Sequence, residues 1–448
     1  MTRRCHAHPR AAWPRRGTTG RKLIALAALA AATLLAVTSS VPASARAITP
    51  AGGPAASARP AVAAAMARRP AATTTGTLRG WGRNEAGELG DGSTARRTTP
   101  VTVRLPSGTR VRSVRSECSH TLALTASGAV LAWGTNQQGE LGDGTATDRH
   151  RPVRVKLPGG TRVSAVRAGC QFSLALTTTG RVLAWGDGDF LGAGNGLGSE
   201  VPVPVMLPAA TRITAIATGG VFSLALTSTG RVLAWGDNSS GQLGDGTTSS
   251  RLAPVAVRLP AGVRVRSLAA GEDHSLALTR SSQVLAWGLN STGQLGDGTV
   301  KDRHKPERIR VRLPGPPAGK ITALIAGCAH SMALTSHRLA LAWGDNRFGE
   351  LGIGTRTTSR RRPARVHLPA GTTVTALSAN CESSMALTSS GRVLTWGSNQ
   401  FGQLGTGRVS AGSPVPVRVH LPRGLRAVAI GSGPEALQGF AVVRRSGR

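Results

Sequence analysis

The chain has no tyrosine, only six phenylalanines and few acidic residues, because 21 Asp and Glu stand against 55 Lys and Arg. A core with so few aromatic rings has to consist mainly of Leu, Val and Ala, together with some of the eight tryptophans. Hydrophobic residues make up 40% of the 448 residues, and Gly and Pro together about 19%, below the share that marks low complexity. These proportions exclude a disordered chain, a collagen-like fibre and a multi-span membrane protein. They favour a turn-rich, strongly basic globular protein with a formal net charge of +34.

The first 45 residues have the features of an export signal. Seven basic and no acidic residues lie in residues 1–22, an apolar run covers residues 23–37, and Ala43-Ser44-Ala45 offers a cleavage site. This order is typical of a secretory signal peptide, and fifteen apolar residues are few for a membrane span. We therefore expect a secreted or cell-envelope protein without a stable membrane span after cleavage; an uncleaved N-terminal anchor is the alternative. Residues 46–75, rich in Ala and Pro, are expected to form a flexible linker, and residues 444–448 a basic tail.

A unit of about 50 residues is repeated seven times after the linker. Successive Trp-Gly pairs are 52, 52, 50, 52, 56 and 53 residues apart, at Trp81, Trp133, Trp185, Trp235, Trp287, Trp343 and Trp396. In the clearest copy, short apolar runs occur at Ile213–Ala217, Phe222–Thr227, Val232–Trp235 and Pro254–Leu259. Such runs, rich in Val, Ile, Leu and Thr and bounded by turn-forming residues, predict β-strands. Four strands in each unit predict the blade of a β-propeller.

The two ends of the repeat array complement each other. Gly76–Trp81 resembles only the strand that ends in Trp, whereas Arg426–Ile430 and Gly439–Val443 resemble only the first two strands of a unit. The sequence therefore predicts an all-β, seven-bladed propeller over residues 76–443, with four-stranded blades and a ring closed by strands from both termini. Such closure removes an exposed sheet edge. The seven equivalent tryptophans are expected to fill the gaps between sheets rather than to bind a ligand.

The repeat text from Gly219 to Thr247 resembles the regulator of chromosome condensation repeat family. It contains Gly219-Gly220, Ser223–Thr227, Gly230, Val232, Trp235-Gly236, Asn238 and Gly241–Thr247. The resemblance extends over residues 76–443 and implies a seven-bladed β-propeller, in agreement with the strand pattern. The family's namesake is a nucleotide exchange factor on chromatin, and other relatives are secreted bacterial propellers that bind a protein on one face. The resemblance thus implies macromolecular interaction, but no working residue of the exchange factor is matched position by position.

Three functions remain open from the sequence. The first is a secreted, non-enzymatic and monomeric propeller that binds a protein or an anionic cell-envelope polymer through one face. The second is an exchange-factor-like regulator of a GTPase, which requires retention in the cytosol. The third is an enzyme that acts on cell-wall glycan through carboxylates scattered over several loops.

Catalytic and cofactor motifs are poorly matched. Gly315–Lys320 is one residue shorter than a phosphate-binding loop, and Ile321 replaces its Ser or Thr. The aspartates of the repeated Gly-Asp-Gly turn lack the spacing of a calcium loop, and turn chemistry explains them better: Asp91, Asp143, Asp245 and Asp297. We therefore expect no catalytic residue, no cofactor and no metal site.

Four cysteines follow the signal, and all occupy one repeat slot just before the second strand: Cys118, Cys170, Cys328 and Cys381. Four cysteines allow three pairings. Ring geometry favours Cys118–Cys170 and Cys328–Cys381, because each pair joins neighbouring repeats near the channel, where Cα separations of about 5.5–6 Å are plausible. Four free buried thiols are the alternative. The next slot holds three histidines in blades that do not converge on a metal, so we expect structural roles for His120, His274 and His330.

Basic residues also recur at fixed positions. One slot after Leu-Pro holds Arg110, Arg162, Arg212, Arg264, Lys320 and Arg426, with Thr373 as the exception. The slot before that Leu holds Arg104, Lys156, Arg258, Arg312, His367 and His420. Because rotation turns a slot into a ring, the sequence predicts a basic belt that attracts an acidic protein, an anionic cell-wall polymer or nucleic acid; a solvated strand face is the alternative. No aromatic residue interleaves these arginines, which disfavours single-stranded nucleic acid.

Overall fold

The computed structural model describes residues 76–309, 319–356 and 359–446. The expected signal peptide (1–45), the linker (46–75), Arg312 and most of the Gly315–Lys320 segment lie outside these residues. The described residues all belong to one compact unit, Ala63–Arg448, and form 28 strands and a single 3₁₀ turn at Gly188–Phe190. No helix in these ranges is long and apolar enough to cross a membrane.

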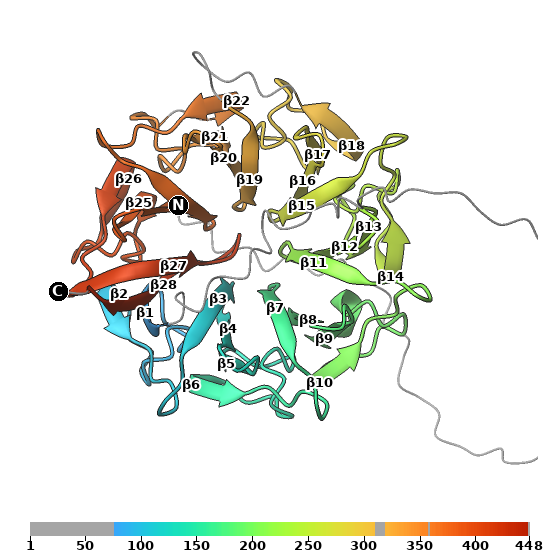
Figure 1. Ribbon diagram of the computed structural model, residues 1–448, viewed down its shortest axis with the longest axis horizontal. Coiled ribbons are helices and arrows are strands. Elements are labelled where there is room, and N and C mark those ends of the chain that lie inside the picture. Colours follow the sequence, from blue (N-terminus) through green and yellow to red (C-terminus); the bar gives the residue numbers. More distant parts are fainter. Residues whose placement is uncertain (1–75, 310–318, 357–358, 447–448) are drawn as a thin grey trace, which may run out of the picture. The chain divides into compact units, whose positions relative to one another are not determined.

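Seven antiparallel sheets of four strands are arranged around a common centre (Figure 1). Six of them consist of strands consecutive in the chain, with the first strand nearest the centre and the fourth at the periphery (Figure 1). Their bounds are β3 (Val111–Glu117), β4 (His120–Thr125), β5 (Val130–Gly134) and β6 (Arg149–Arg154); β7 (Val163–Ala168), β8 (Phe172–Thr177), β9 (Val182–Gly186) and β10 (Ser199–Pro204); β11 (Ile213–Thr218), β12 (Phe222–Thr227), β13 (Val232–Gly236) and β14 (Arg251–Ala256); β15 (Val265–Ala270), β16 (His274–Thr279), β17 (Val284–Gly288) and β18 (Arg303–Ile309); β19 (Ile321–Ala326), β20 (His330–Thr335), β21 (Ala340–Asp345) and β22 (Ser359–Arg365); β23 (Val374–Ala379), β24 (Ser383–Thr388), β25 (Val393–Asn399) and β26 (Ser410–Arg418).

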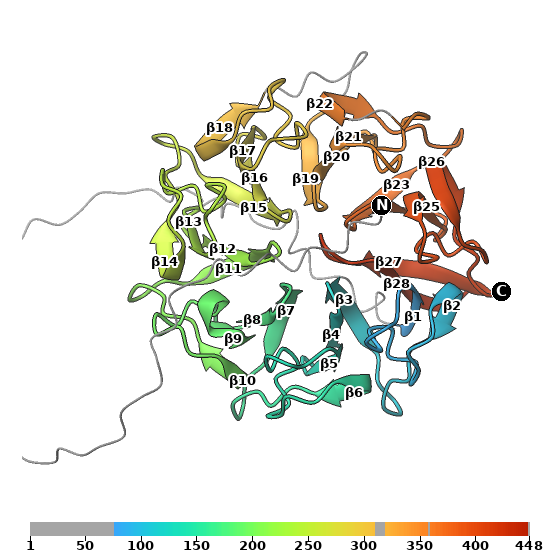
Figure 2. The same ribbon diagram turned by 180° about the vertical axis from the view of Figure 1, so that it is seen from behind.

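The seventh sheet is built from both ends of the described chain. Its strands, from the centre outward, are β27 (Leu425–Gly431), β28 (Gln438–Arg445), β1 (Thr77–Gly82) and β2 (Arg97–Thr102). Figure 2 shows β1 and β2 beside β28 from the opposite side. The predicted seven-bladed fold and its closure by both termini are confirmed. Strand β28 continues two residues past the expected end at residue 443, because Arg444 and Arg445 still pair with Arg426 and Leu425.

The core lies between neighbouring sheets, and the seven repeat tryptophans join it across each gap. Every one of these indoles is fully buried. Trp287 of β17, for example, packs with Leu224 and Val232 of the preceding sheet. Its Nε1–H donates to the main-chain oxygen of Gln242, 2.8 Å away in that sheet's long loop.

The same indole-to-carbonyl bond recurs at all seven positions, with acceptors 2.7–3.0 Å away: Trp81 to Gln403, Trp133 to Glu88, Trp185 to Glu140, Trp235 to Phe190, Trp343 to Gln294 and Trp396 to Glu350, besides Trp287 to Gln242. The bond from Trp81 to Gln403 closes the ring. A Cβ at Gly244, whose φ is +69°, would lie 2.7 Å from Trp287 Nε1, so glycine is needed for this loop to approach the indole. Each repeat tryptophan is therefore buried between two sheets and also holds a long loop by a hydrogen bond.

Replacing Trp287 by Ala is expected to lower the free energy of unfolding by about 3–5 kcal/mol, because it leaves a cavity between sheets and removes one of the two hydrogen bonds that Gln242 O accepts, the other coming from the Ser275 hydroxyl. The measurement is urea denaturation of the purified chain. Val300→Ala serves as the control, since this side chain is 42% exposed and should change stability by less than about 0.5 kcal/mol. Equal stabilities of the two variants would contradict the bridging role of the indole.

Candidate functional site

The propeller has two chemically different faces. Because neighbouring strands run antiparallel, the first-to-second and third-to-fourth connections of a sheet emerge at one end, and the others at the opposite end. In the sheet of β11–β14, residues 219–221 and 237–250 mark the first end, and residues 228–231 and 257–264 mark the second. We call the first end the long-loop face and the second the blade-connection face.

Acidic residues are confined to one side of this division. Every Asp and Glu lies between Glu85 and Glu435, in or beside the connections of the long-loop face, except Glu307 in the outer strand β18. The connections of the blade-connection face contain no acidic residue: 103–110, 126–129, 155–162, 178–181, 205–212, 228–231, 257–264, 280–283, 319–320, 336–339, 366–373, 389–392 and 419–424. One face of the ring therefore carries cations without carboxylates to neutralise them.

The predicted basic slot lies on this carboxylate-free face. Arg110, Arg162, Arg212, Arg264, Lys320 and Arg426 are all exposed, at the beginning of the innermost strands. The ion pairs formed by the described residues include none of these six. Five further exposed arginines, in or next to the turns between second and third strands, share this face and were missed from the sequence: Arg181, Arg231, Arg280, Arg338 and Arg392.

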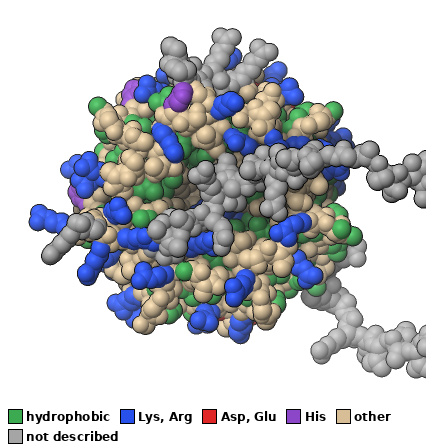
Figure 3. Space-filling model, viewed as in Figure 1, with side chains coloured by type: hydrophobic (Ala, Val, Ile, Leu, Met, Phe, Trp, Pro, Cys, Tyr) green, Lys and Arg blue, Asp and Glu red, His purple; other side chains and the backbone are tan. Residues whose placement is uncertain are grey.

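Figure 3 shows basic side chains around the ring and no acidic side chain in view. The second predicted slot is also exposed where it is described, at Arg104, Lys156, Arg258, His367 and His420. Several of these side chains lie beside glycines of the long loops, as Arg104 does at Gly92 and Lys156 at Gly144. The separation of charge between faces gives the ring a directional field that attracts anions from one side.

The repeated Gly-Asp-Gly aspartates have a structural role, as their turn chemistry predicts. Asp245 accepts hydrogen bonds from the main-chain N–H and the hydroxyl of Thr247 and forms an ion pair of 2.7 Å with Arg251. Burial raises the pKa of this carboxyl, but the bonds from Thr247 and Arg251 outweigh it and the pKa is lowered overall. The same arrangement occurs at Asp91, Asp143 and Asp297. These aspartates stabilise turns.

A second loop position holds Glu and Gln interchangeably. Burial raises the pKa of Glu350 to about 8, and its Oε2 accepts a hydrogen bond from the main-chain N–H of Phe348. The equivalent Gln242 accepts the same bond from Ser240 through its amide oxygen. Because an uncharged amide does the same work, the raised pKa of Glu350 reflects a structural role rather than a catalytic one.

The three repeated histidines are buried, as expected. In each, Nε2 lies 2.9 Å from a serine hydroxyl of the next sheet, in the pairs His120–Ser173, His274–Ser331 and His330–Ser384. Burial lowers the pKa of His120 and His274 to about 3 and that of His330 to about 4. These side chains are therefore neutral links between blades at neutral pH.

Neutral buried histidines make stability depend on pH. Below pH 6.5 the unfolded chain binds protons at these positions and the folded chain does not, so stability falls as the pH drops. Each histidine should remove about 1.4 kcal/mol per pH unit between pH 6 and pH 4. His274→Phe copies Phe222, which holds the same slot one blade earlier, and should reduce this dependence by one histidine's share. Urea denaturation of both proteins over this pH range provides the test; the difference between them cancels the carboxyl contributions, and parallel curves would show that His274 is protonated when folded.

The centre of the ring is crossed by the connection between β27 and β28. This connection has six residues, 432–437, whereas the equivalent turns of the other blades have two or three. Towards the sheet β23–β26, the N–H of Cys381 donates to Ala436 O at 3.1 Å, and Cys328 Sγ of the sheet beyond lies 3.2 Å from Pro434 O. Towards the sheet β3–β6, the main-chain N–H of Glu435 donates to Glu117 Oε1. We call residues 432–437 the axial loop.

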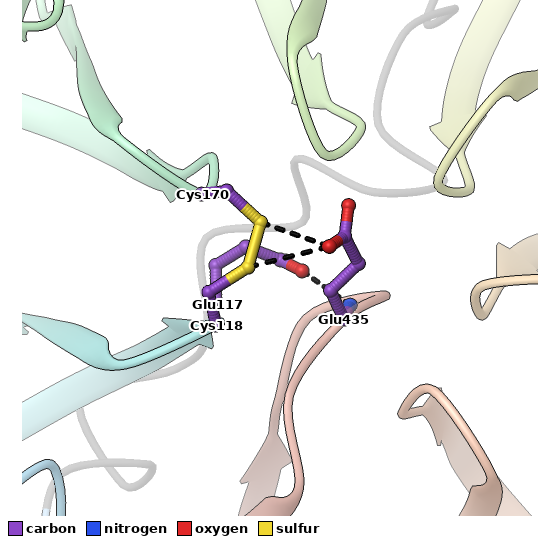
Figure 4. A group of neighbouring side chains, drawn as sticks. All are labelled: Glu117, Cys118, Cys170 and Glu435. Atoms are coloured by element: carbon purple, nitrogen blue, oxygen red, sulfur yellow. Dashed lines mark hydrogen bonds between the residues drawn. A yellow bond between two sulfur atoms is a disulfide. The ribbon is translucent and has the colours of Figure 1, made fainter. Parts of the chain in front are cut away.

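The axial loop lies between the two predicted cysteine pairs. The structure brings Cys118 to Cys170 and Cys328 to Cys381 at disulfide distance, with Cα separations of 5.1 Å and 4.5 Å. Both pairs join the first-to-second turns of neighbouring blades. Glu117 and Glu435, which sequence reasoning missed, lie beside the first pair (Figure 4). The length of residues 432–437 is the sequence signal that would have indicated them.

We expect non-reducing peptide mapping of the protein, purified under oxidising conditions, to recover Cys118 linked to Cys170 and Cys328 linked to Cys381. Each link closes a loop of just over 50 residues, for which chain-entropy reasoning gives about 4 kcal/mol of stabilisation. A Cys328→Ser/Cys381→Ser variant should accordingly unfold at lower urea concentration under oxidising conditions and match the parent after reduction. Recovery of free thiols, or of links between the two pairs, would refute this connectivity.

These observations define a seven-bladed repeat propeller. The side chains described above either stabilise the blades and their loops or form charged surfaces. A family model for the RCC1-like domain matches residues 45–280 and 156–436. The chain therefore belongs to the RCC1-like domain family, as the repeat text implied.

Several characterised proteins resemble the chain over most of its length. It is 32% identical over 327 residues to the ultraviolet-B receptor UVR8 of Arabidopsis thaliana, covering 73% of this chain and 62% of the receptor. It is 34% identical over 320 residues to the human E3 ubiquitin-protein ligase HERC2, covering 71% of this chain and 6% of the ligase. It is 28% identical over 337 residues to human protein RCC2, covering 75% and 58%. The chain thus spans less than two thirds of the length of each of these relatives.

Solved structures agree on the fold. Prp20p of Saccharomyces cerevisiae, described together with its binding to Gsp1p and histones, has a TM-score of 0.74 and 24% identity, covering 84% of this chain and 93% of that one. Human WBSCR16 has a TM-score of 0.72 and 24% identity, covering 82% and 100%. At this level of identity the likeness shows the seven-bladed architecture.

Proposed function

We propose that the protein is an exported, non-enzymatic binding module that holds an anionic cell-envelope polymer on its blade-connection face. The observation that supports this proposal is the combination of exposed cations and absent carboxylates on that face. A phosphate- or carboxylate-bearing polymer would meet attraction at every blade and no competing negative charge. Export rests on the expected signal peptide at residues 1–45.

The composition of the face favours a polymer over a folded protein. Stable protein interfaces usually bury aromatic or large apolar anchors at their centre. The large hydrophobic side chains exposed among the described residues are Leu197, Val201, Met206, Leu252, Val300, Val409 and Val415, and Met206 alone belongs to a blade connection. A flexible polyanion requires no such anchors, because its affinity comes from many individually weak ionic contacts.

No specific observation favours nucleotide exchange on a GTPase or hydrolysis of cell-wall glycan. The exchange-factor hypothesis rests on family membership, and the glycan-active hypothesis needs exposed carboxylates free of structural duties. The raised pKa values of Glu88, Glu140 and Glu350 belong to the loop position that Gln shares. Binding through the basic face is therefore the function that we propose.

Charge reversal on the basic face is expected to weaken polyanion binding by tenfold or more. The variant is Arg110→Glu/Arg162→Glu/Arg212→Glu, and binding is measured with polyphosphate as a model polyanion and with isolated cell envelopes. Affinity of the parent should fall steeply between low and moderate salt, because exposed charges are screened over a Debye length of about 8–10 Å.

The matched control is Arg96→Glu/Arg356→Glu/Arg408→Glu. These three arginines are exposed in long loops of the long-loop face, so the variant has the same net charge as the face variant. The control should bind within about threefold of the parent, since its altered charges lie away from the proposed site. Equal losses in both variants would assign binding to net charge alone, and a chain found only in the cytosol would contradict export.

A further inference from the structure

Two carboxyl groups and a cysteine pair meet at the centre of the propeller (Figure 4). One ligand atom from each of Glu117, Cys118, Cys170 and Glu435 can be chosen so that all four lie within 4.8 Å of one another. Glu435 Oε2 is 3.3 Å from Cys118 Sγ and 3.0 Å from Cys170 Sγ. Glu117 and Cys118 are consecutive at the end of β3, Cys170 lies in the β7–β8 turn, and Glu435 belongs to the axial loop, so three separate segments converge on one point.

One carboxylate oxygen of each glutamate in this group lacks a hydrogen-bond donor among the described residues. Glu117 is fully buried, and its Oε2 receives no hydrogen bond from the described residues. Glu435 is 8% exposed, and the sulfurs beside its Oε2 carry no hydrogen to donate when they form a disulfide. A buried carboxylate oxygen without a donor is costly unless a proton or a cation neutralises it.

The surroundings add negative rather than positive charge. The carboxylates of Glu272 and Asp273 repel Glu435, and Glu435 repels Glu117. The arginines on the nearby inner strands do not neutralise the pair directly, since Arg115 and Arg167 donate to the main-chain oxygens of Val114 and Val166.

Glycines leave the space that the carboxylates occupy. A side chain at Gly433 would collide with Glu117 Oε2, and a side chain at Gly220 would collide with Glu435 Oε1. The axial loop and the β11–β12 turn thereby admit both carboxyl groups to the centre. The convergence is thus built into the backbone.

We propose that Glu117, Cys118, Cys170 and Glu435 bind one Zn²⁺ when the Cys118–Cys170 disulfide is reduced. Two thiolates and two carboxylate oxygens are ligands that zinc accepts in a tetrahedral site, at about 2.3 Å for sulfur and 2.0–2.2 Å for oxygen. The sulfur–oxygen separations of 3.0 and 3.3 Å already approach the edge of such a tetrahedron. Cys118 and Cys170 can therefore either form a disulfide or, once reduced, bind a metal ion together with Glu117 and Glu435.

Conversion of the disulfide state into the zinc-binding state requires a reductant, and we name a dithiol for this step. The dithiol supplies two electrons and two protons, becomes a disulfide itself, and leaves Cys118 and Cys170 as thiols. Zinc binding then releases the two thiol protons to solvent, because the thiolate is the ligand. Both cysteines are half-buried rather than enclosed, so a small dithiol reaches them from the long-loop face.

The second cysteine pair provides an internal comparison. Cys328 and Cys381 occupy the same repeat slot on the other side of the axial loop, but Cys328 Sγ faces the main-chain oxygen of Pro434. Among the described residues, the group of potential metal ligands at the centre includes neither of them. Cys328 is also only 7% exposed. The second pair is therefore a disulfide without a metal-binding alternative.

The test measures zinc bound to the purified full chain after reduction with a phosphine and removal of excess metal. We expect about one zinc per chain for the parent and for Cys328→Ser/Cys381→Ser, and at least a tenfold loss of affinity for Cys118→Ser/Cys170→Ser. The oxidised parent should bind none. Cobalt substitution gives a second readout, since thiolate-to-cobalt absorption reports sulfur ligation directly.

The carboxylates are tested separately from folding. Glu117→Gln/Glu435→Gln preserves size and the Cys118–Cys170 disulfide and should weaken zinc binding tenfold or more, whereas Glu382→Gln, beside Cys381, should leave it unchanged. Peptide mapping of each oxidised variant confirms that the ring has folded. Zinc binding by the reduced parent no tighter than by Cys118→Ser/Cys170→Ser would overturn the proposal, as would equal losses in the Cys328→Ser/Cys381→Ser variant.

Discussion

The ring depends on the hydrogen bond and packing contact that each repeat tryptophan makes with the preceding blade. A four-stranded sheet of Val, Leu and Ala has little to hold it at a fixed angle to its neighbour, and the chain has almost no other aromatic side chains for this purpose. The indole supplies both the bulk that fills the gap and a donor that fixes a long loop to the next sheet. Repeated seven times, this contact sets the spacing of the blades and thus where every other slot residue lies.

That repetition explains why the fold was predictable from the sequence and why part of the site was not. Trp-Gly spacing, strand runs and incomplete end units indicated the number of blades, their strands and the closure. The cysteine pairing and the buried histidines followed from slot position, because equivalent residues of neighbouring blades lie close together in any ring. The expectation that basic slots form an exposed belt on the blade connections used the same reasoning.

Features outside the repeat were missed. Residues 432–437 have no counterpart of equal length in the other blades, so no slot rule indicates that Glu435 reaches Glu117 across 318 positions. The separation of charge between faces was missed for another reason. It depends on which end of a sheet each connection leaves, and becomes visible only when Asp and Glu are sorted by connection rather than by repeat position. Counting the length of the turns between first and second strands would have pointed to the axial loop.

The two faces of the propeller also differ in what their polar side chains do. The long loops contain aspartates, asparagines and glutamates that are occupied with their own turns, whereas the blade connections are short, basic and poor in such internal contacts. The carboxylates that remain at the centre are screened from the basic face by the depth of the sheets. An anionic partner on one face and a cation at the axis would therefore occupy separate electrostatic environments within one ring.

Closure of the ring by the C-terminal hairpin has a consequence for the order of assembly. Within the propeller, the axial loop belongs to the hairpin that is synthesised last, so the centre stays open while six blades are already made. A chain that stops short of residue 425 lacks β27 and β28 of the closing sheet and also the segment that separates the two cysteine pairs. The β27–β28 hairpin therefore completes the closing sheet and fills the centre of the ring together. A product truncated before it would expose a sheet edge and the four cysteine sulfurs at the same time.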